Sequence, residues 1–550
     1  MKYRWKTISS LEKIFFHNFD ALKEETRGTM FKNEIYSFQL AGEFENTELV
    51  KTKCSIELES ELSPYISLYS IGYCANDLPS IEIEDDDNYI TKEPGLFPDP
   101  LFKIRDNTFM LCDRQVRGIW VCVEPKGKIS GNFDIRLKLY DRNNTHLKTL
   151  VYSLKIIDAS LPEQRLINTG WFHGDCIALL HNTEIGSKEY FSILEKYLKV
   201  YVKFGHNMIL TPMFTPPIDT AVGKERLTNQ LVCVRVNDGK YSFDFSPLKK
   251  WMNICSANGI KYFEFSHLFT QWGAKYAPKI MAYDAAEYKR IFGWETKGDS
   301  AGYIRFLEAF LPRLVAFLKE EKVFERCFFH ISDEPDGSKE HKKRYGRAKD
   351  LIVRYIPKDR IFDTIDEYSY YKEGIINCPI VAIDRIKDFT ENNVPRLWAY
   401  YCMAQRKNVA NRFLAQPSYR NRILGLQLYK YNIEGFLQWG FNFWLSAGAQ
   451  KVIDPYKNTT ADMSFPGGDP FVVYPLDKFF EVVCSLRLYV FNEALQDMRA
   501  LYFLEQHLGR DNVLKLLSDI DGFEVYPKNE EYILNLRGLI NRKAEEIING

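Results

Sequence analysis

The chain has 550 residues, of which 45% are apolar and 27% charged, with 73 acidic and 73 basic side chains. This length favours two or three domains, and the zero net charge gives no support for nucleic acid or an anionic membrane as a partner. No window approaches the roughly 20 consecutive apolar residues of a membrane-spanning helix. The first residues lack the apolar core and cleavage site of a secretion signal. We therefore expect a cytoplasmic location, unless a leader has been trimmed from the sequence.

Several sequence motifs of common enzyme classes are missing. The 11 cysteines form no CxxC pairs and no Cys/His clusters at zinc spacing, and there is no HExxH. We therefore expect free thiols, no metal and no cofactor. A GxSxG elbow is also absent, which disfavours a serine hydrolase. The aromatic content of 15% is high, but aromatic rings both fill cores and stack on sugars.

The N-terminal part of the chain is rich in strand patterns. Alternating or β-rich runs at 118–125, 132–141 and 149–158 are separated by stretches of Asn, Asp and Gly. This pattern predicts an antiparallel β-sandwich over residues 1–162, whose last strand runs into a linker near 154–164.

From residue 163 onward, strand and helix patterns alternate. Apolar helical spacing is clearest at 187–205 and 301–321. The predicted strands are 170–178, 206–214, 260–268, 326–333, 360–366, 378–384, 396–402 and 435–444. Such alternation is typical of parallel βαβ units, and eight of them predict a (β/α)8 TIM-like barrel over 163–475. An open doubly wound sheet is the alternative, although the GxGxxG of its nucleotide-binding form is missing.

Helical spacing returns near the C-terminus, at 476–509 and 535–550. It predicts a helical segment over 476–550 that packs on the barrel. The predicted fold class is therefore multidomain α/β plus β, with an N-terminal β-sandwich, a (β/α)8 barrel and C-terminal helices.

Two adjacent carboxylates, Asp333 and Glu334, follow the fourth predicted barrel strand in the stretch FFHISDEPDG. Active sites of this fold are built where the strands end. Acidic residues in such turns also cap helices, but Asp336 and Ser338 are available for that role. From the sequence, capping and catalysis both remain open for the pair.

Adjacent carboxylates suit a particular kind of acid catalysis. Each raises the proton affinity of the other, so one can stay protonated beside an ionised neighbour. Conventional retaining glycosidases instead hold two carboxylates about 5 Å apart on either side of the bond. If the substrate sugar carries a 2-acetamido group, its own carbonyl oxygen can attack the anomeric carbon. One carboxylate would then orient the acetamide while the other protonates the leaving oxygen.

The region from about Gly170 to Asp497, roughly three fifths of the chain, resembles the catalytic region of glycoside hydrolase family 123 and the wider DUF4091 group. The segments that carry this resemblance are 171–178, 207–220, 262–278, 292–296, 330–335, 397–402, 411–418, 424–444 and 467–475. The resemblance implies a β-sandwich followed by a (β/α)8 barrel. It also implies retaining, substrate-assisted hydrolysis of terminal β-N-acetylgalactosaminides, with Asp333 orienting the acetamide and Glu334 as acid/base.

Further candidates for sugar binding lie near the ends of other predicted strands. His173 and Asp175 alternate on the first strand, whereas Glu264 ends the third and is the rival nucleophile of a conventional mechanism. The full set is His173, Asp175, Glu264, His267, Trp272, Tyr400, Tyr401, Trp439, Asn442 and Trp444. Core packing remains an alternative for the histidine and the tryptophans, and only one of the adjacent tyrosines can face the site.

Two other acidic positions are expected to have structural roles. Asp366 and Glu367 form a second acidic pair after the fifth strand, where helix capping is favoured, and Asp469 is expected to shape a loop after the eighth strand.

The sequence thus predicts a glycosidase that removes a terminal β-linked N-acetylhexosamine. The preference for N-acetylgalactosamine depends on the resemblance alone. Two alternatives stay open: a conventional retaining glycosidase that uses Glu334 and Glu264, and a catalytically silent glycan-binding protein. The expected partner is a carbohydrate, and neither a nucleic acid nor a membrane span is expected. The aglycone, exo or endo action and the oligomeric state are not determined by the sequence.

Overall fold

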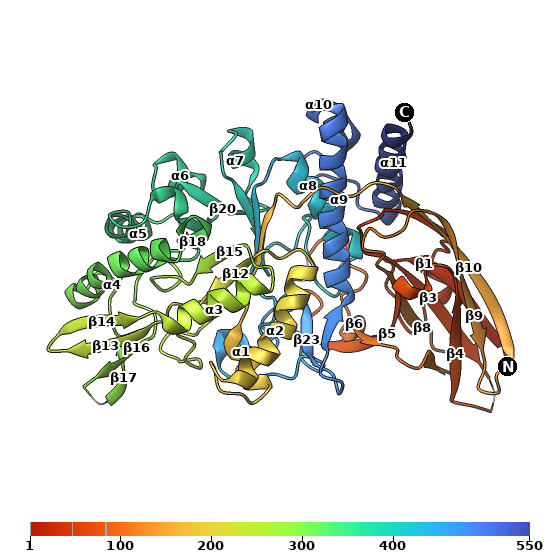
Figure 1. Ribbon diagram of the computed structural model, residues 1–550, viewed down its shortest axis with the longest axis horizontal. Helices are drawn as coiled ribbons and strands as arrows, with labels where there is room; N and C mark the ends of the chain where they lie inside the picture. The colour runs from red at the N-terminus through yellow and green to blue at the C-terminus, as the bar shows by residue number, and fades with distance from the viewer. Residues whose placement is uncertain (1, 47, 83–84, 286) are drawn as a thin grey trace.

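The computed structural model of the chain describes residues 2–46, 48–82, 85–285 and 287–550. The structure is mixed α/β and multidomain, with sheets from the N-terminal part at one end and a barrel-like sheet at the other (Figure 1). The long helix α9 (Leu486–Leu508) lies between these two ends. The predicted fold class is confirmed at this level.

Two sheets at the N-terminal end enclose a hydrophobic core, which includes stacked Phe38 and Tyr152 rings. The first sheet has the order β1 (Lys2–Ser9), β3 (Tyr36–Glu45), β8 (Arg117–Val123), β5 (Ile66–Asn76), β6 (Gly95–Lys103), β24 (Val482–Ser485) and β23 (Val473–Leu476). The second has the order β2 (Arg27–Phe31), β10 (His146–Ile157), β9 (Gly131–Tyr140), β4 (Lys51–Glu59) and β7 (Thr108–Cys112). Neighbouring strands are antiparallel except β10 and β2.

The predicted helix over 476–509 is wrong in its first turns. Residues 473–485 instead form the hairpin of β23 and β24, and Cys484 pairs with Leu101 of β6. The Val482-Val483-Cys484 run favours an extended chain, because β-branched side chains pack well on a sheet. Ser485 then caps α9 by accepting a hydrogen bond from the Leu488 amide, so the helix begins at Leu486. The chain therefore returns to the N-terminal sheet after the barrel. The domain boundaries stay a prediction.

Eight parallel strands form the barrel-like sheet, and they follow one another in chain order. The sheet order is β18 (Cys327–Phe329), β15 (Tyr262–Phe265), β12 (Met208–Thr211), β11 (Ile167–Gly170), β22 (Gly435–Gln438), β21 (Trp398–Tyr401), β20 (Cys378–Ala382) and β19 (Phe362–Ile365). Between β18 and β19 only a single parallel bridge, Phe329 to Ile361, is formed. The sheet is thus nearly closed and not a complete barrel ladder.

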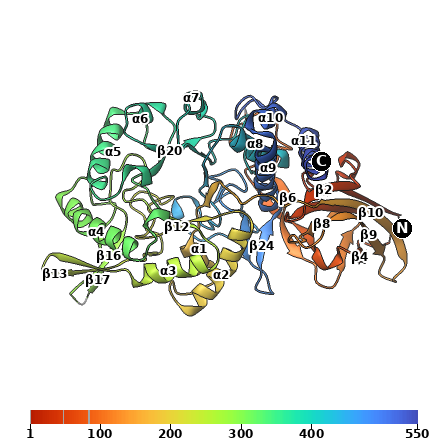
Figure 2. The ribbon, with the colours of Figure 1, turned by 45° about the horizontal axis from the view of Figure 1, so that its top comes forward.

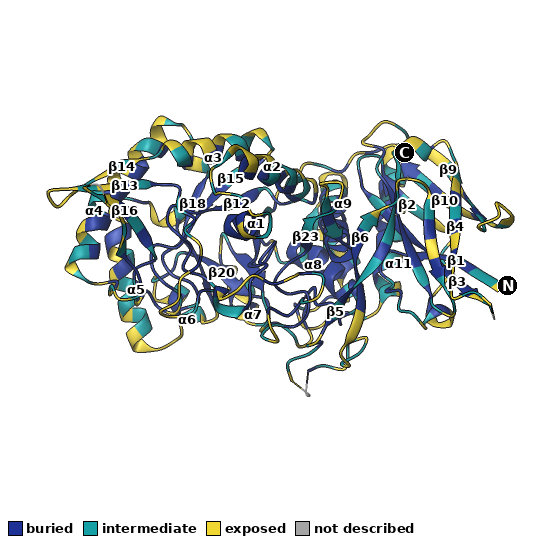
Figure 3. Cartoon of the chain, turned by 90° about the horizontal axis from the view of Figure 1, so that it is seen from below, coloured by how far each residue is buried: buried dark blue, intermediate teal, exposed yellow. Residues whose placement is uncertain are grey.

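A helix follows every strand of this sheet, and helices α3 to α7 lie around its outside (Figure 2). The helices before α9 are α1 (Gly174–Leu180), α2 (Lys188–Lys203), α3 (Ser246–Ala257), α4 (Ala301–Glu320), α5 (Lys339–Ile352), α6 (Tyr368–Lys372), α7 (Lys387–Glu391) and α8 (Ser418–Lys430). Those after it are α10 (Arg510–Leu514) and α11 (Glu530–Asn549). The strands are buried while the outer helices carry exposed residues, as the apolar strand sequences require (Figure 3).

The first strand of the barrel differs from its prediction. It was expected at 170–178, but β11 ends at Gly170 and α1 begins at Gly174. A small additional sheet, inserted after the second and third strands, has the order β14 (Lys240–Asp244), β13 (Cys233–Asn237), β16 (Ile280–Asp284) and β17 (Glu287–Phe292).

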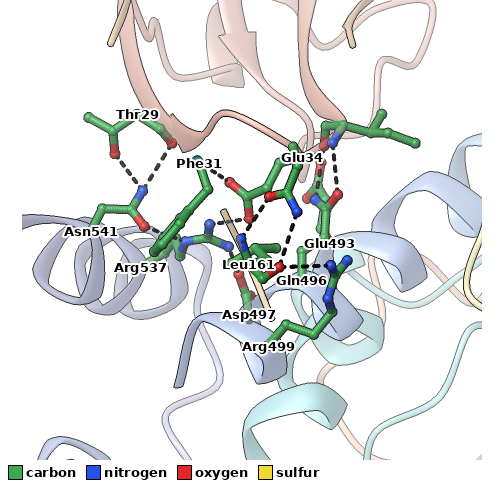
Figure 4. A network of polar contacts seen from close by, with 12 residues as sticks. Thr29, Phe31, Glu34, Leu161, Glu493, Gln496, Asp497, Arg499, Arg537 and Asn541 are labelled. Atoms are coloured by element: carbon green, nitrogen blue, oxygen red, sulfur yellow. Dashed lines mark hydrogen bonds and ion pairs between the residues drawn. The ribbon is translucent and has the colours of Figure 1, made fainter. Parts of the chain in front are cut away.

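A polar network joins the N-terminal sheets to the C-terminal helices (Figure 4). Asp497 of α9 accepts hydrogen bonds from Arg422 of α8, at 2.8 and 3.1 Å, and from Arg537 of α11, which also binds Glu34. Arg422 further donates to Glu493 at 2.9 Å. All five side chains are buried or nearly so. The network thus connects the N-terminal sheets to helices α8, α9 and α11, and each of its buried charges is paired.

The 11 cysteines are free thiols, as predicted. Among the described residues, no helix has both the length and the apolar character needed to cross a membrane.

Candidate active site

The carboxylate pair lies just beyond β18, the fourth strand of the barrel-like sheet. Ser338, not the pair, caps the following helix α5 by accepting a hydrogen bond from the His341 amide. Glu334 has a φ of 42°, in the left-handed region. Such strain in a non-glycine residue persists only where the surroundings enforce it, and it concentrates at functional sites.

Side chains of β19 hold this turn across the unpaired seam of the barrel. Asp363 accepts the Ile331 amide with both carboxylate oxygens, at 3.0 and 3.1 Å. The next residue, Thr364, donates to Asp333 Oδ1 and accepts the Glu334 amide at 3.1 Å. Between β18 and β19 these side-chain hydrogen bonds take the place of most of the strand pairing. They therefore fix the positions of Asp333 and Glu334.

Both carboxylates open into one cavity of about 330 Å³. Five of the predicted site residues line it: Trp272, Asp333, Glu334, Tyr400 and Trp439. The remaining lining residues are Trp171, Asp219, Thr220, Ala221, Gln271, Thr364, Cys402, Met403, Leu437, Gly448 and Phe465. This volume is at the small end for a ligand pocket, which suits one sugar ring.

Asp333 is held as a hydrogen-bond acceptor. Its Oδ2 receives the Gln271 side-chain amide at 2.9 Å, and its Oδ1 receives the Thr364 hydroxyl. Burial raises the pKa of its carboxyl, while these two donors and the charge of His330 oppose that rise. With both oxygens oriented by donors, the side chain is fixed against the cavity wall and can accept one further N–H.

Glu334 is in a different electrostatic state. Burial raises the pKa of its carboxyl to about 8, and the adjacent Asp333 adds to the rise. The Tyr400 hydroxyl lies 2.8 Å from Glu334 Oε1 and 3.0 Å from Asp366 Oδ1. That hydroxyl is the donor toward both carboxyl groups, and its bond to Glu334 opposes the rise in the pKa of Glu334. Glu334 is therefore a neutral acid near pH 7, beside an acceptor.

Asp366 and Glu367 do not have the predicted capping role. Glu367 occupies the position before α6, but its side chain makes no capping hydrogen bond. Asp366 instead binds Tyr400 and so belongs to the surroundings of Glu334. The early end of β19 at Ile365 points Asp366 toward the seventh strand rather than toward the helix.

Glu264, the rival nucleophile, is a structural residue. Its carboxylate accepts hydrogen bonds from the Thr169 hydroxyl at 2.6 Å and the Trp171 indole at 2.7 Å, and it lies 2.7 Å from His330 Nε2. It is completely buried and does not line the cavity. With both oxygens occupied and no access to the cavity, it cannot attack a sugar bound there.

His330 bridges two buried carboxylates below the pair. Its Nε2 faces Glu264, and its Nδ1 lies 3.2 Å from Asp363. Burial lowers its pKa, but the hydrogen bonds that His330 donates to Asp363 and Glu264 outweigh burial and raise the pKa to about 10. The residue is therefore an imidazolium at neutral pH, and its charge lies near Asp333.

One group of potential metal donors occurs among the described residues, formed by His267, His330 and Asp363, with donor atoms within 4.8 Å of one another. The two imidazole rings are stacked, with centroids 4.4 Å apart and an interplanar angle of 20°. The lone pairs of stacked rings run nearly parallel and do not converge on one ion. Both nitrogens of His330 are also engaged with carboxylates, so the group fits an imidazolium core better than a metal centre.

Several predicted sugar-binding residues lie in the protein core instead of the cavity. His173 and Asp175 do not share a strand: His173 precedes α1 and Asp175 lies in its first turn, where it forms a buried ion pair with Arg226 at 2.8 Å. His173 Nε2 lies 3.0 Å from the Trp439 carbonyl oxygen. The misplaced first strand caused this error, because the alternation of a strand does not apply to a helix.

Four further residues that were predicted to bind sugar also lie in the protein core. His267 is buried against Trp171 and His330, and Tyr401 is buried with no hydrogen-bond partner for its hydroxyl among the described residues. Asn442 bonds the backbone of His173, and the Trp444 indole donates to the Val473 carbonyl oxygen at 3.1 Å. None of these side chains lines the cavity.

Trp439 forms part of the cavity wall and is held there by Asp469. The indole N–H donates to Asp469 Oδ2 at 3.0 Å, and its ring packs against Phe465. Burial raises the pKa of the Asp469 carboxyl to about 7, although Arg412 and the indole oppose this. Asp469 thus fixes an aromatic wall in place.

Sequence reasoning missed four polar residues of the cavity: Asp219, Thr220, Gln271 and Thr364. Asp219 and Gln271 lie in long loops after the second and third strands, and loops of that kind often carry function. Gln271 lies beside Trp272 in the segment 262–278, which carries the family resemblance, so the signal was present. Thr364 lies within a strand and gave no signal.

A larger groove of about 1240 Å³ lies between the N-terminal sheets and α11. Its wall includes neither Asp333 nor Glu334 and belongs to no part of the barrel mouth. Arginines neutralise several of its carboxylates, as for Glu34 and Glu493. The small cavity is therefore the better candidate for chemistry.

Comparison with known proteins identifies the family. The model of the glycoside hydrolase 123 catalytic domain matches residues 171–504, which is more than half of the chain. The chain belongs to glycoside hydrolase family 123. A solved structure of a family 123 glycoside hydrolase from Clostridium perfringens, reported for glycolipid glycan hydrolysis, is 17% identical, covers 100% of each chain and has a TM-score of 0.78. That likeness shows the same fold.

Other solved structures are much less similar. A beta-galactosidase described from Bacteroides fragilis and a beta-glucuronidase from Parabacteroides merdae each share 10% identity and 84% coverage of this chain, with TM-scores of 0.29 and 0.30. The matched regions cover 57% and 50% of those two chains, and at TM-scores this low the similarity supports no conclusion about fold or function. The curated proteins contain no match to this chain. Family membership supports a glycosidase that acts on a carbohydrate.

Proposed function

We propose that this glycoside hydrolase removes a terminal β-linked N-acetylhexosamine, with N-acetylgalactosamine favoured, by a retaining, substrate-assisted mechanism. The observation that supports this most is the pair itself. Asp333 and Glu334 are sequence neighbours on one wall of the cavity, with an anchored acceptor beside a neutral acid. The galacto preference depends on the family resemblance and not on a particular residue.

The roles follow from the different surroundings of the two carboxylates. Asp333, oriented by Gln271 and Thr364, accepts the acetamide N–H of the substrate and stabilises positive charge as the oxazolinium ring forms. The acetamide carbonyl oxygen attacks the anomeric carbon as the glycosidic bond breaks. Glu334 gives its proton to the leaving oxygen and then, as a carboxylate, removes a proton from the water that opens the oxazolinium ion.

The surroundings of Glu264 also favour this mechanism. A conventional retaining enzyme needs a second carboxylate about 5 Å from the acid, on the other side of the bond. Glu264 is fully bonded and outside the cavity, so it does not supply that carboxylate. An internal nucleophile from the substrate supplies the attack instead, at a high effective concentration.

A small site favours removal of single terminal sugars. The cavity is bounded by Trp439, Phe465 and the loops after the second, third and eighth strands. Its volume of about 330 Å³ accommodates one ring with its acetamide group. We therefore propose exo action, with the leaving group emerging at the exposed Trp272.

The test is hydrolysis of three aryl β-glycosides: the N-acetylgalactosaminide, the N-acetylglucosaminide and the plain galactoside. Each is assayed with the wild type, Asp333→Asn and Glu334→Gln. Turnover restricted to N-acetyl sugars and greatly reduced in both variants supports the proposal. Equal turnover of the plain galactoside would remove the acetamide from the mechanism. Sugar binding without any turnover would instead identify a silent glycan-binding protein.

A further inference from the structure

Asp219 is a carboxylate of the cavity wall that has no structural partner. It lies in the loop after β12, with a φ of 50°. No donor of the described residues reaches its carboxylate, and Oδ2 is buried without a hydrogen bond. Burial raises the pKa of this carboxyl to about 7, and Asp333 nearby adds to the rise, while the charge of Arg226 opposes it. A buried acceptor without a donor costs about 1–3 kcal/mol, so an unpartnered one in a cavity points to a ligand.

The contrast with other acidic side chains near the cavity strengthens this point. Asp333, Glu334 and Asp469 each accept or share a hydrogen bond with a neighbouring side chain. Asp219 alone among these four is fixed only through its backbone, whose N–H donates to Gln271 Oε1 at 3.0 Å. Its position is thus set while its carboxylate stays free.

Gln271 also fixes where Asp219 lies relative to the pair. The Nε2 of Gln271 donates to Asp333 Oδ2 at 2.9 Å, while its Oε1 accepts the Asp219 amide. The Gln271 side chain therefore joins Asp219 to Asp333, and Asp219 adjoins Asp333 in the cavity that Glu334 also lines. On the proposed substrate, the groups that meet Glu334 and Asp333 are the leaving oxygen on C1 and the acetamide on C2. The ring carbon that follows C1 and C2 is C3, and it carries a hydroxyl group.

We propose that Asp219 accepts a hydrogen bond from the C3 hydroxyl of the sugar whose C2 acetamide is held by Asp333. This inference rests on the proposed function and extends it to a binding residue that reads the sugar. The hydroxyl donates to the unpartnered carboxylate oxygen, so the buried acceptor is satisfied only when the sugar is bound. A sugar without that hydroxyl leaves the acceptor unpaired and binds more weakly.

The experiment is a double-mutant cycle in which one change is made in the ligand. Dissociation constants of an aryl β-N-acetylgalactosaminide and of its 3-deoxy analogue are measured by calorimetry. The protein carries Glu334→Gln, which keeps the ligand intact, with or without Asp219→Asn. We expect the 3-deoxy change and Asp219→Asn each to weaken binding about 10- to 100-fold, as for a hydrogen bond to a charged group. Together they should weaken it by little more than either alone.

Controls separate this outcome from general damage. Asp238→Asn, in the exposed turn between β13 and β14, changes another aspartate with a positive φ and should leave both constants unchanged. The 4-deoxy analogue should show independent, multiplicative losses with Asp219→Asn. Coupling to the 4-deoxy change instead would overturn the assignment to C3, and multiplicative losses with the 3-deoxy change would overturn the role of Asp219.

The same materials distinguish this inference from the proposed function. Coupled binding of the 3-deoxy analogue without hydrolysis by the wild type would keep Asp219 as a sugar-binding residue while rejecting the hydrolase mechanism. Loss of turnover in Asp219→Ala that is restored by azide would make Asp219 a nucleophile and overturn its role in recognition. Failure of the Glu334→Gln protein to bind any of these sugars would contradict both proposals.

Discussion

Two groups of buried carboxylates occur in this molecule, and their partners differ. At the junction with the N-terminal sheets, Asp497 and Glu493 are paired with arginines of α8 and α11 (Figure 4). In the cavity, Asp219, Asp333 and Glu334 have no salt-bridge partner among the described residues. The junction carboxylates and Asp333 are buried, whereas Asp219 and Glu334 are half-buried and open into the cavity. The two groups therefore differ both in counter-charge and in access for a ligand.

The effect is visible in the pKa values of Asp497 and Glu334, although burial still raises the pKa of the paired Glu493 to about 7. Burial alone would raise the pKa of Asp497, but Arg422 and Arg537 hold it below its ordinary value. Burial raises the pKa of Glu334 to about 8, and the neighbouring carboxylate adds to it. Paired charges fix the arrangement of the domains, whereas unpaired ones leave a proton and free acceptors for a substrate.

The largest expected effect concerns the acid. Glu334→Gln should lower kcat by about 10²- to 10⁴-fold on glycosides with poor leaving groups, because the proton donor is lost. The loss should be smaller for an aryl glycoside whose leaving group needs little protonation. Steady-state kinetics on an alkyl and an aryl N-acetylgalactosaminide measure this difference, and equal losses on both would argue against Glu334 as the acid.

The paired group should respond in stability instead of activity. Arg422→Met leaves Glu493 and part of Asp497 unpaired in the interior, which we expect to cost about 3–5 kcal/mol of unfolding free energy. Denaturant unfolding measures this, with the exposed Arg347→Met as the control. The kcat of the folded variant at low temperature should stay near that of the wild type. A large loss of kcat with unchanged stability would show that the two groups are not separate in function.

The pH dependence of stability gives a third way to separate the groups. The pKa of Glu334 is raised in the folded protein, so folding favours its protonated form. The contribution of Glu334 to the free energy of unfolding is fully present below the pKa of Glu334 in the unfolded chain. It is lost as the pH rises through about 8. Glu334→Gln should therefore match the wild type in Tm near pH 4 and exceed it above pH 8. A Tm difference independent of pH would mean that Glu334 is not held neutral.

The smallest expected effect lies at the rim. Trp272 is 52% exposed, lines the cavity and has a φ of 61°. If its ring stacks on the leaving group, Trp272→Ala should lower kcat/KM several-fold for aryl and disaccharide substrates but little for a methyl glycoside, since such contacts contribute about 0.5–1.5 kcal/mol. Trp272→Phe should retain most of the activity. Uniform losses over all leaving groups would place the ring against the terminal sugar instead.

Seven of the eight strands of the barrel-like sheet lie within their predicted ranges, since their apolar runs are bounded by turns and helices. It also predicted that Asp333 and Glu334 follow the fourth strand, because the break after FFHIS is local. It could not predict that Glu264 is occupied, since Thr169, Trp171 and His330 come from other strands. The misplaced first strand likewise put His173 and Asp175 in the wrong setting. The predictions failed where they depended on contacts between segments that are distant in the sequence, because such contacts leave no local pattern.

Asp219 is a candidate site residue that the sequence alone did not reveal. Nothing in TPPIDT distinguishes a free carboxylate from an ordinary loop aspartate. Its importance appears only when the Gln271 bridge places it beside Asp333 in one cavity. The paired group shows this too, because Glu34 and Arg537 are separated by most of the chain.

The central claim is that the substrate's acetamide oxygen is the nucleophile, and its electron density can be changed directly. We would measure kcat/KM for aryl β-N-acetylgalactosaminides whose acetyl group carries zero, one, two or three fluorine atoms. Each fluorine weakens the carbonyl oxygen as a nucleophile, so the account predicts a steep, progressive fall across the series. Rates that stay flat across the series would show that the nucleophile belongs to the enzyme, and would direct attention to Asp219.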